Sequence, residues 1–496
     1  MHSFLPLFTK GAFTMFIRKV VCCILLIALS LTVGNVHLVS TVNALDTEKT
    51  EDKIFDTATL NDDFVDNHII VILNNVESLK FKDYTSSDFP EIACKSVRNL
   101  STAAAARVQA KLRKEQSTTT DIGAAFLNKN VKTETFKTIL CLELETPGKA
   151  NVLQAIESLK QRKDIYYVGP DYILPLNLTR GPVTPDVPSN VGWHTYAIDL
   201  SSAWQVETGS SSVKVGVVDT GIDASHPALQ GKVNTNLSRN FAPDSVSATT
   251  DPYGHGTHVA GIIAGSGNNS HGISGVCQNI TLVSLRVFYR KQSVSNDPYT
   301  TAGIVAEAID YANEMNIPIL NLSLGVVVVG VGNLGITSLS TAIIDYSGLV
   351  VCAAGNDAYN LDLEADYYPA TLEHDNIISV GAATSQYTVA SFSNYGHSKV
   401  DLFAPGSIVA SCFSTSVCSS SGCTASGHLS YGYHIMSGTS MAAPMVTGVA
   451  ALLLSSDSSL TSSEIKALIL NNTESYSSFS GKCVTGGLLN AGNVFS

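Results

Sequence analysis

The chain has 496 residues, of which 45% are apolar, and a formal net charge of −12. At roughly 150 residues per domain, this length predicts two or three domains with a sizeable core. The negative charge argues against nucleic acid and anionic membranes as partners, because binding to phosphate groups needs a basic surface.

The first residues have the pattern of a secretory signal. Arg18 and Lys19 precede an apolar run over 20–33, which is shorter than the roughly 20 residues of a membrane-spanning helix. Small residues at 42–44 offer a cleavage site, so the pattern predicts a signal peptide over 1–44, with a retained signal anchor as the alternative. We therefore expect a secreted protein without a membrane partner, or one held in a secretory granule or a lysosome-like compartment.

A small α+β domain is predicted next. Residues 45–67 are polar and acidic and indicate a flexible lead. From residue 68 on, apolar strand patterns and helical patterns alternate: strands over 69–73, 136–144 and 165–173, and helices over 101–115 and 149–160. This order predicts a compact domain over 68–176, followed by a proline-containing linker over 177–192.

After the linker the pattern becomes β-α-β. Near-continuous apolar strands are predicted over 213–218, 282–287, 317–324, 349–354 and 377–381, with a helix over 302–316. Such strands indicate a doubly wound, mainly parallel sheet with helices on both faces, over residues 193–496. Functional sites on these sheets gather at the carboxyl ends of the strands. Asp219 and the turn at Gly355 and Asn356 both fall at such ends.

Two short stretches offer acid–base groups. Asp219 follows a buried strand, and the alternative is a turn or helix-cap carboxylate. His255 opens a helix of small residues. A two-histidine metal site with His258 is the rival, but a spacing of three without a nearby acidic ligand disfavours it.

Two further stretches offer a donor and a nucleophile. Asn356 ends a strand with an amide that can donate to an oxyanion. Ser440 begins an apolar helix, where the helix dipole and the free N–H groups favour negative charge, although a simple capping serine is the commoner alternative. A serine nucleophile needs a neutral imidazole, and that imidazole needs an anion to fix its tautomer. The chain supplies all three groups.

These stretches resemble the motifs of subtilisin-like serine proteases. The matching motifs are residues 219–223, 255–261, 353–356 and 438–444, in the order Asp, His, Ser known for subtilisin. The resemblance covers about residues 186–496. Residues 68–175 resemble the inhibitor-type propeptide of the same family, most clearly at 167–172.

The resemblance implies a role for each residue. Ser440 would attack the peptide carbonyl, His255 would carry the proton, and Asp219 would orient His255. The side chain of Asn356 and the N–H of Ser440 would form the oxyanion hole. His258 would be packed or bonded to the backbone rather than catalytic.

The resemblance also implies substrate-binding residues. Residues 321–325 look like the strand that pairs with extended substrate, with Ser323 in it and with Leu324 and Gly325 walling the specificity pocket. Tyr367 would lie at the pocket base and shorten it, and a cis bond is expected before Pro369.

Calcium is the cofactor that the resemblance suggests, in a structural role only. A loop at 267–273 would bind it through Asn269, and Asp186 would supply another ligand. Calcium needs six to eight oxygens, and Ala228 stands where the family pattern has a carboxylate. A Gly/Asn-rich turn without an ion is the alternative. Catalysis is expected to require no cofactor.

Ten cysteines suit the secretory route. Cys352 lies in a predicted buried strand, where we expect a free thiol. A disulfide is expected in the Ser-rich stretch that holds Cys412, Cys418 and Cys423.

The sequence is therefore interpreted as a secreted serine endopeptidase made as a zymogen. Its expected partners are protein and peptide substrates and its own propeptide as an intramolecular inhibitor, and a monomer is expected. One alternative is a pseudoprotease that only binds, which would lack a catalytic residue. Another is a kexin-type processing protease, which would have an acidic pocket and a β-rich domain after the protease.

Overall fold

The computed structural model describes residues 54–55, 58–78, 80–115, 136–176, 192–266, 274–291, 295, 297–328, 336–418, 428–430 and 432–496. The predicted signal peptide, the linker and the calcium ligands Asn269 and Asp186 lie outside these residues. The described residues are built around two large sheets. We call residues 54–176 the N-terminal sheet region and residues 192–496 the parallel-sheet region.

The N-terminal sheet region has the strand order β1-β5-β2-β4-β3. Its strands are β1 (Ile54–Phe55), β2 (Phe64–Leu73), β3 (Cys94–Asn99), β4 (Ile139–Leu144) and β5 (Ile165–Pro175). Its helices are α2 (Asn75–Ser78), η1 (Ser86–Asp88), α3 (Thr102–Glu115) and α5 (Lys149–Leu159). The three strands and two helices predicted from the sequence are all present. β3 was not predicted, because most of its side chains are polar and only one is buried, so they give no apolar signal.

Alternation along β2 gives this sheet two packed faces. Ile69 and Val71 point to one face, where α5 covers them with Val152, Ile156 and Leu159, three apolar residues at helical spacing. Ile70 and Ile72 point to the opposite face and pack there with residues of β4 and β5. Since both faces are buried here, residues 69–73 of β2 form a continuous apolar run.

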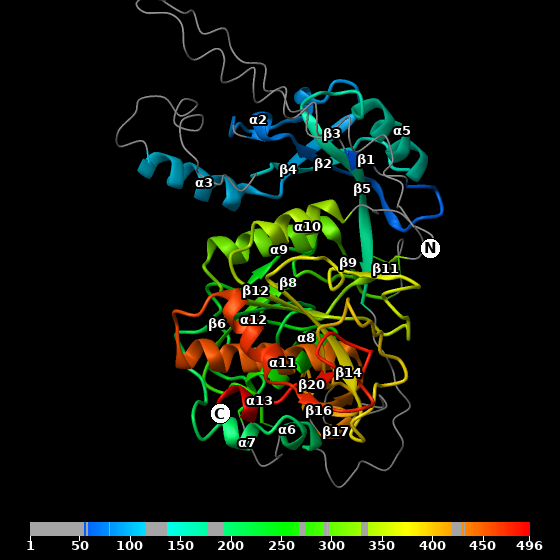
Figure 1. The fold of residues 1–496 in the computed structure, drawn as a ribbon. Coiled ribbons are helices and arrows are strands. Elements are labelled where there is room, and N and C mark those ends of the chain that lie inside the picture. The colour runs from blue at the N-terminus through cyan, green and yellow to red at the C-terminus, as the bar shows by residue number, and fades with distance from the viewer. Residues whose placement is uncertain are drawn as a thin grey trace, which may run out of the picture. The chain divides into compact units, whose positions relative to one another are not determined.

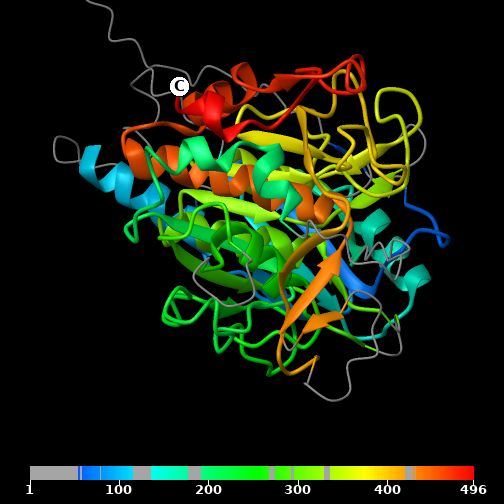
Figure 2. The same cartoon turned by 90° about the horizontal axis from the view of Figure 1, so that it is seen from below.

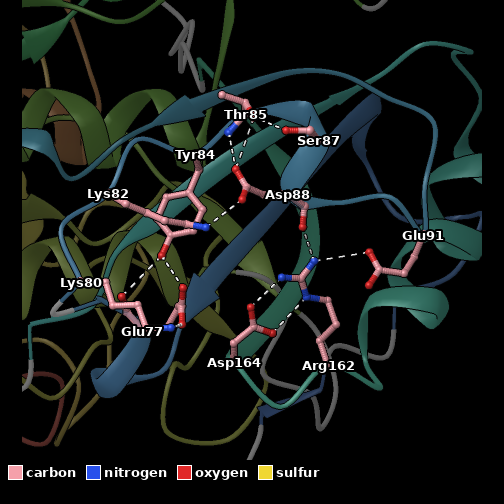
Figure 3. Close-up of polar contacts among 10 residues, drawn as sticks. All are labelled: Glu77, Lys80, Lys82, Tyr84, Thr85, Ser87, Asp88, Glu91, Arg162 and Asp164. Atoms are coloured by element: carbon pink, nitrogen blue, oxygen red, sulfur yellow. Dashed lines mark hydrogen bonds and ion pairs between the residues drawn. The ribbon is translucent and has the colours of Figure 1, made fainter.

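Arg162 ties the segment between β2 and β3, at the end of η1, to the loop before β5 (Figure 3). Its guanidinium forms two hydrogen bonds with the carboxylate of Asp164, at 3.0 and 2.6 Å, and donates to the carbonyl of Asp88 at 2.6 Å. The guanidinium also lies 4.8 Å from the ring centre of Phe89, which is fully buried. One partly buried cation thus fixes two loops.

The parallel-sheet region confirms the predicted fold class. Its large sheet has the order β19-β20-β15-β14-β12-β10-β6-β8-β7, parallel except for the β19–β20 pair. The strands are β6 (Lys214–Asp219), β7 (Arg239–Asn240), β8 (Thr281–Arg286), β10 (Ile319–Leu322), β12 (Leu349–Ala353), β14 (Ile377–Ala383), β15 (Leu402–Pro405), β19 (Glu474–Ser475) and β20 (Gly487–Leu488).

Helices cover both faces of this sheet (Figures 1 and 2). On one face lie α8 (His255–Ala264), α11 (Thr439–Ser456) and α12 (Ser462–Asn471), and on the other lie α9 (Ala302–Glu314) and α10 (Thr337–Ile344). Short elements complete the region: β9 (Tyr299–Thr301), β11 (Val326–Val328), β13 (Asp366–Tyr368), β16 (Val409–Cys412), β17 (His428–Ser430), β18 (Tyr433–Met436), α6 (Trp193–Ala197), α7 (Leu200–Ala203) and α13 (Ala491–Val494).

The apolar helix predicted after Ser440 is α11, which lies along the sheet (orange in Figure 2). By length and composition alone it could cross a membrane, but 89% of its apolar window is buried inside the protein. Its small and aliphatic residues pack against β10, β12, β14 and β15. α11 is therefore the central core helix of the region.

The N-terminal sheet extends into the parallel-sheet region through β9. The end of β5 pairs antiparallel with β9, with Leu174 opposite Thr300. Leu174 is fully buried and belongs to the same apolar cluster as α9 and α10. β9 was not predicted from the sequence.

The thiols agree in part with expectation. Cys352 is a free, fully buried thiol in β12, as predicted. Cys412 is also a free thiol. Cys418 is disulfide-bonded, and its partner lies outside the described residues, so the pairing within the Ser-rich stretch stays a prediction.

Candidate active site

Three neighbouring strands of the parallel sheet bring polar groups to one edge. β6, β10 and β12 are adjacent, and their carboxyl ends lead to Asp219, Ser323 and Asn356 respectively. The sequence predicted this position at strand ends for Asp219 and Asn356. Ser440, in the first turn of α11, reaches the same edge, where its backbone and side chain both bond to Ser323.

Asp219 and His255 form a buried pair. The Nδ1 atom of His255 lies 2.8 and 3.0 Å from the two carboxylate oxygens of Asp219. An ionised carboxylate only accepts hydrogen bonds, so Nδ1 carries the proton and Nε2 is the basic nitrogen of the neutral ring. The contact between Asp219 and His255 requires a glycine at position 256, because a Cβ on that residue would lie 2.2 Å from the carbonyl oxygen of Gly221. A glycine therefore lets α8 approach the end of β6.

The environment raises the pKa of His255. Burial alone would lower this pKa, but the charge of Asp219 and its hydrogen bond outweigh burial, and the charge of Asp251 adds to them. The imidazolium that forms when His255 takes a proton is thus stabilised inside the protein. That property suits a general base that must hold a proton transiently.

Asp251 is a structural carboxylate that the sequence interpretation missed. It is fully buried and accepts hydrogen bonds from the backbone N–H groups of Gly254 and Thr257 at 2.8 and 2.9 Å, so it holds the start of α8. It also accepts from the hydroxyl of Thr220 at 2.9 Å, which ties α8 to the end of β6. The only sequence signal for this role is that Asp251 is an acidic residue four positions before His255. Nearby polar residues in the same loop look equally suited to capping the helix, so the signal does not single out Asp251.

Ser440 lies at the second position of α11, so its own N–H has no acceptor within the helix. In this structure the hydroxyl of Ser440 donates to the carbonyl of Ser323 at 3.3 Å. A hydroxyl has one proton, so the proton is directed to Ser323 and not to His255. Hydrogen bonds between catalytic groups are often unformed or long when no substrate is bound.

Asn356 is oriented by the residue before Ser440. Its amide oxygen accepts from the backbone N–H and the hydroxyl of Thr439, at 2.8 and 3.0 Å. Fixing the oxygen on Thr439 fixes the direction of the amide N–H₂ group on the other side.

The carbonyl of Ser440 has an unusual donor. In a regular helix it would accept from the N–H of residue 444, but that residue is Pro444, which has none. The hydroxyl of Ser323 donates to this carbonyl instead, at 2.9 Å. Ser323 is held in turn by the side-chain amide of Asn321 at 2.9 Å, whose oxygen accepts from Thr447 at 2.9 Å.

The predicted pocket residues lie close together. Tyr367 is only 2% exposed, and its ring packs beside Gly325 and Gly355, where an added Cβ would lie 2.3 and 2.5 Å from ring atoms. Leu324 is 3% exposed. The cis bond expected before Pro369 is present. Ser323, Leu324 and Gly325 lie just beyond β10, which ends at Leu322.

His258 is neutral and structural, as expected. Its Nε2 lies 3.1 Å from the carbonyl oxygen of His434, and burial, followed by the nearby histidines, lowers its pKa well below 6.5. Since His255 is paired with Asp219, a two-histidine metal site at this position is not favoured.

At Ala228, the one described position of the predicted calcium site, the backbone carbonyl accepts from the N–H of Ser266, and the side chain carries no oxygen.

Comparison with known proteins agrees with this geometry. Residues 210–486 match the subtilase family. Halolysin of Haloferax mediterranei is 38% identical over 264 residues, which cover 52% of this chain and 44% of halolysin. Thermitase of Thermoactinomyces vulgaris is 36% identical over 280 residues, which cover 56% of this chain and 87% of thermitase. This chain thus spans less than half the length of halolysin but most of thermitase.

A solved structure shows the same fold over most of the chain. Fervidolysin from Fervidobacterium pennivorans, described as a keratinolytic enzyme related to subtilisin, aligns with a TM-score of 0.62 and 23% identity. The alignment covers 89% of this chain and 62% of fervidolysin. That share is too large to fall within the parallel-sheet region alone, so the likeness includes part of the N-terminal sheet region.

Proposed function

This chain belongs to the subtilase family of serine proteases, and we propose that it is a secreted endopeptidase made as a zymogen, with Asp219, His255 and Ser440 as its catalytic triad. The observation that carries the proposal is the buried Asp219–His255 pair at the sheet edge that also holds Ser440. Pairing with Asp219 leaves the second imidazole nitrogen of His255 as the base.

In the proposed reaction, the Oγ atom of Ser440 attacks the peptide carbonyl carbon while Nε2 of His255 takes its proton. The imidazolium is stabilised by the charge of Asp219. His255 then gives the proton to the leaving amine, which departs and leaves an acyl-enzyme on Ser440. Water hydrolyses this ester with His255 again acting as the base.

The oxyanion would be held by Asn356 and the N–H of Ser440. The support is the fixed amide of Asn356, whose oxygen is bound by Thr439. Preorganised donors at a developing charge stabilise the transition state, and one such donor in a subtilisin is worth about 10²–10³ in rate. Protein substrates would bind in extended form beside residues 321–325, with Leu324, Gly325 and Tyr367 shaping the specificity pocket.

The N-terminal sheet region would act as the propeptide. Its support is a set of contacts with α9: the carboxylate of Asp310 accepts from the N–H groups of Ala103 and Ala104 at 2.9 and 2.8 Å. Arg98 forms an ion pair with Glu307 at 2.7 Å. The pairing of β5 with β9 adds an extended strand to the parallel-sheet region, in the way a bound peptide adds one.

Self-processing tests this proposal. The purified precursor is followed on a gel beside Ser440→Ala, and the parent is expected to be cut in the linker over 177–192 while Ser440→Ala stays intact. A serine-directed fluorophosphonate should label the processed parent and not Ser440→Ala. Processing of Ser440→Ala at the parent's rate, or labelling that survives the substitution, would contradict the proposal.

Secretion and a monomeric state belong to the same proposal. Secretion rests on the signal pattern over 1–44, and expression with and without these residues checks it by the appearance of protease in the medium. Structural calcium at Asn269 and Asp186 stays a prediction, because these residues lie outside the described ones. Comparing the unfolding temperature in calcium and in chelator checks it.

A further inference from the structure

Three metal-binding side chains meet on the sheet of the N-terminal region. His68 lies on β2, Cys141 on β4 and Asp171 on β5, and β2 runs between the other two strands. Their ligand atoms all lie within 4.8 Å of one another. This group of three side chains is separate from the proposed active site.

The contact between His68 and Asp171 is a long hydrogen bond whose length also suits two ligands of one metal ion. Nδ1 of His68 lies 3.4 Å from Oδ2 of Asp171. A charge-assisted hydrogen bond between such groups is shorter, about 2.7–2.9 Å. Zinc–ligand lengths of about 2.0–2.2 Å at a tetrahedral angle place a nitrogen and an oxygen ligand about 3.3–3.5 Å apart.

The surroundings orient these ligands and leave an entry path. The other oxygen of Asp171, Oδ1, accepts from the N–H of Gly303 in the first turn of α9 at 2.9 Å, which turns Oδ2 toward His68. Metal ligands are commonly held by such outer hydrogen bonds. Asp171 and Cys141 are buried, whereas the side chain of His68 is 29% exposed and opens the group to solvent.

The charges beside the group are mixed. Arg98 lies opposite Cys141 in the β3–β4 register, and its guanidinium interacts with the Cys141 side chain and with the charge of Asp171. Glu307 offsets the charge of Arg98 through an ion pair at 2.7 Å. A thiolate at Cys141 and the carboxylate of Asp171 together carry the two negative charges that a divalent ion neutralises. Calcium and magnesium are disfavoured, because they prefer oxygen ligands and the group offers one carboxylate.

We propose that His68, Cys141 and Asp171 bind a zinc ion, with water as the fourth ligand. Zinc accepts this mixture of nitrogen, sulfur and oxygen in a tetrahedral arrangement. Because α9 holds Asp171 through Gly303, the ion also stabilises the contact between the N-terminal sheet region and α9. All three ligands belong to the N-terminal sheet region, so the joined state is stabilised to the extent that the Gly303 contact makes it bind zinc more tightly than the separated state does.

Metal titration of the full-length Ser440→Ala chain tests the proposal, since this variant is expected to keep the N-terminal region attached. After chelator treatment under reducing conditions, zinc chloride is added in a calorimeter and cobalt chloride in a spectrophotometer. We expect one zinc ion per chain and a tetrahedral cobalt spectrum with a thiolate-to-cobalt charge-transfer band. No stoichiometric zinc binding, or a cobalt spectrum without the thiolate band, would overturn the proposal.

Variants locate the site. In the same background, Cys141→Ser should abolish the thiolate band and weaken zinc binding by at least about 10-fold. Cys94→Ser is the matched control, because Cys94 is another buried free cysteine of this sheet outside the group, and it should bind like the parent. Zinc binding that survives Cys141→Ser unchanged would refute the assignment.

A second variant guards against misfolding. If Cys141→Ser does not fold, His68→Gln carries the test, because the part-exposed side chain of His68 is less needed for packing. It should weaken zinc binding at least about 10-fold while the unfolding temperature in chelator stays at the parent's value. Parent-like zinc affinity in His68→Gln would also refute the site.

Discussion

At the scale of single residues, the carbonyl of Ser440 shows how the proposed nucleophile is held. Pro444 removes the helical donor to this carbonyl, and the hydroxyl of Ser323 replaces it at 2.9 Å. The replacement fixes the first turn of α11 to the end of β10. Ser323 was predicted as a substrate-binding residue, and the structure adds this contact with the backbone of Ser440.

Replacing Ser323 should therefore cost stability and rate. Ser323→Ala leaves a buried carbonyl without its donor, which costs about 1–3 kcal/mol in the free energy of unfolding. We expect kcat to fall more than KM changes, because the position of Ser440 is loosened. Urea unfolding and steady-state kinetics measure both effects.

Ser338→Ala is the matched control, since the hydroxyl of Ser338 is buried and makes no hydrogen bond. It should leave stability and rate close to the parent's. Equal effects of the two substitutions would show that the Ser323 hydroxyl has no special role.

The charge of Asp219 sets the pH dependence of the proposed base. Because Asp219 raises the pKa of His255, the acid limb of kcat/KM should lie above the ordinary histidine value of 6.5. In Asp219→Asn the negative charge is lost, and burial then lowers the pKa of His255. The acid limb of the kcat/KM profile should therefore move to lower pH. The maximal rate should also fall, by about 10⁴-fold. A pH profile of both proteins measures this, and an unmoved limb would contradict it.

At the scale of elements, apolar patterns predicted the parts that position the site. β6, β12, α8 and α11 are near-continuous runs of apolar or small residues, because each is buried on all sides, and their ends carry the polar groups. β9 could not be found in this way. It is three residues long, and its partner β5 lies more than a hundred residues earlier, so no local period marks it.

The same limit applies to single side chains. Asp251 acts through residues of β6 and α8 that only the fold brings to it. The placement of Tyr367 beside Gly325 and Gly355 likewise depends on three separate segments meeting. Motif positions could be predicted from the sequence, whereas the residues that support them depend on tertiary contacts.

Within the N-terminal sheet, Arg162 should matter more than other ion-paired residues of the same loops. Arg162→Ala removes hydrogen bonds from a charged, partly buried donor, worth about 1.5–3 kcal/mol. Lys82→Ala removes a more exposed ion pair with Asp88, worth about 0–1 kcal/mol. Figure 3 shows both groups. Hydrogen exchange of β2 and β5 in full-length Ser440→Ala should separate the two variants, and equal protection would contradict this ranking.

At the scale of the whole molecule, Asp310 joins the two regions. Its carboxylate receives the first N–H groups of α3, and burial raises its pKa to about 6 although these hydrogen bonds lower it. Asp310→Ala removes this cap, at about 0.5–2 kcal/mol. We expect faster appearance of protease activity after processing.

Glu314→Ala is the control for Asp310→Ala, because Glu314 lies one turn further along α9 and is exposed. It should follow the parent's time course. Activity that appears no faster in Asp310→Ala than in Glu314→Ala would show that the cap does not hold the regions together.

The pairing of β5 with β9 also means that cleavage of the linker and release of the N-terminal sheet region would be two separate steps. Hydrolysis in the linker breaks one covalent bond, but Leu174 stays buried in the cluster beneath α9 and β9 keeps its partner strand. When β5 leaves, β9 becomes an open strand edge, which any extended chain can pair with, including that of another molecule. In the proposed maturation, packing would therefore set the delay between the cut and the opening of this edge. That delay would determine how long a newly made chain stays shielded from its neighbours.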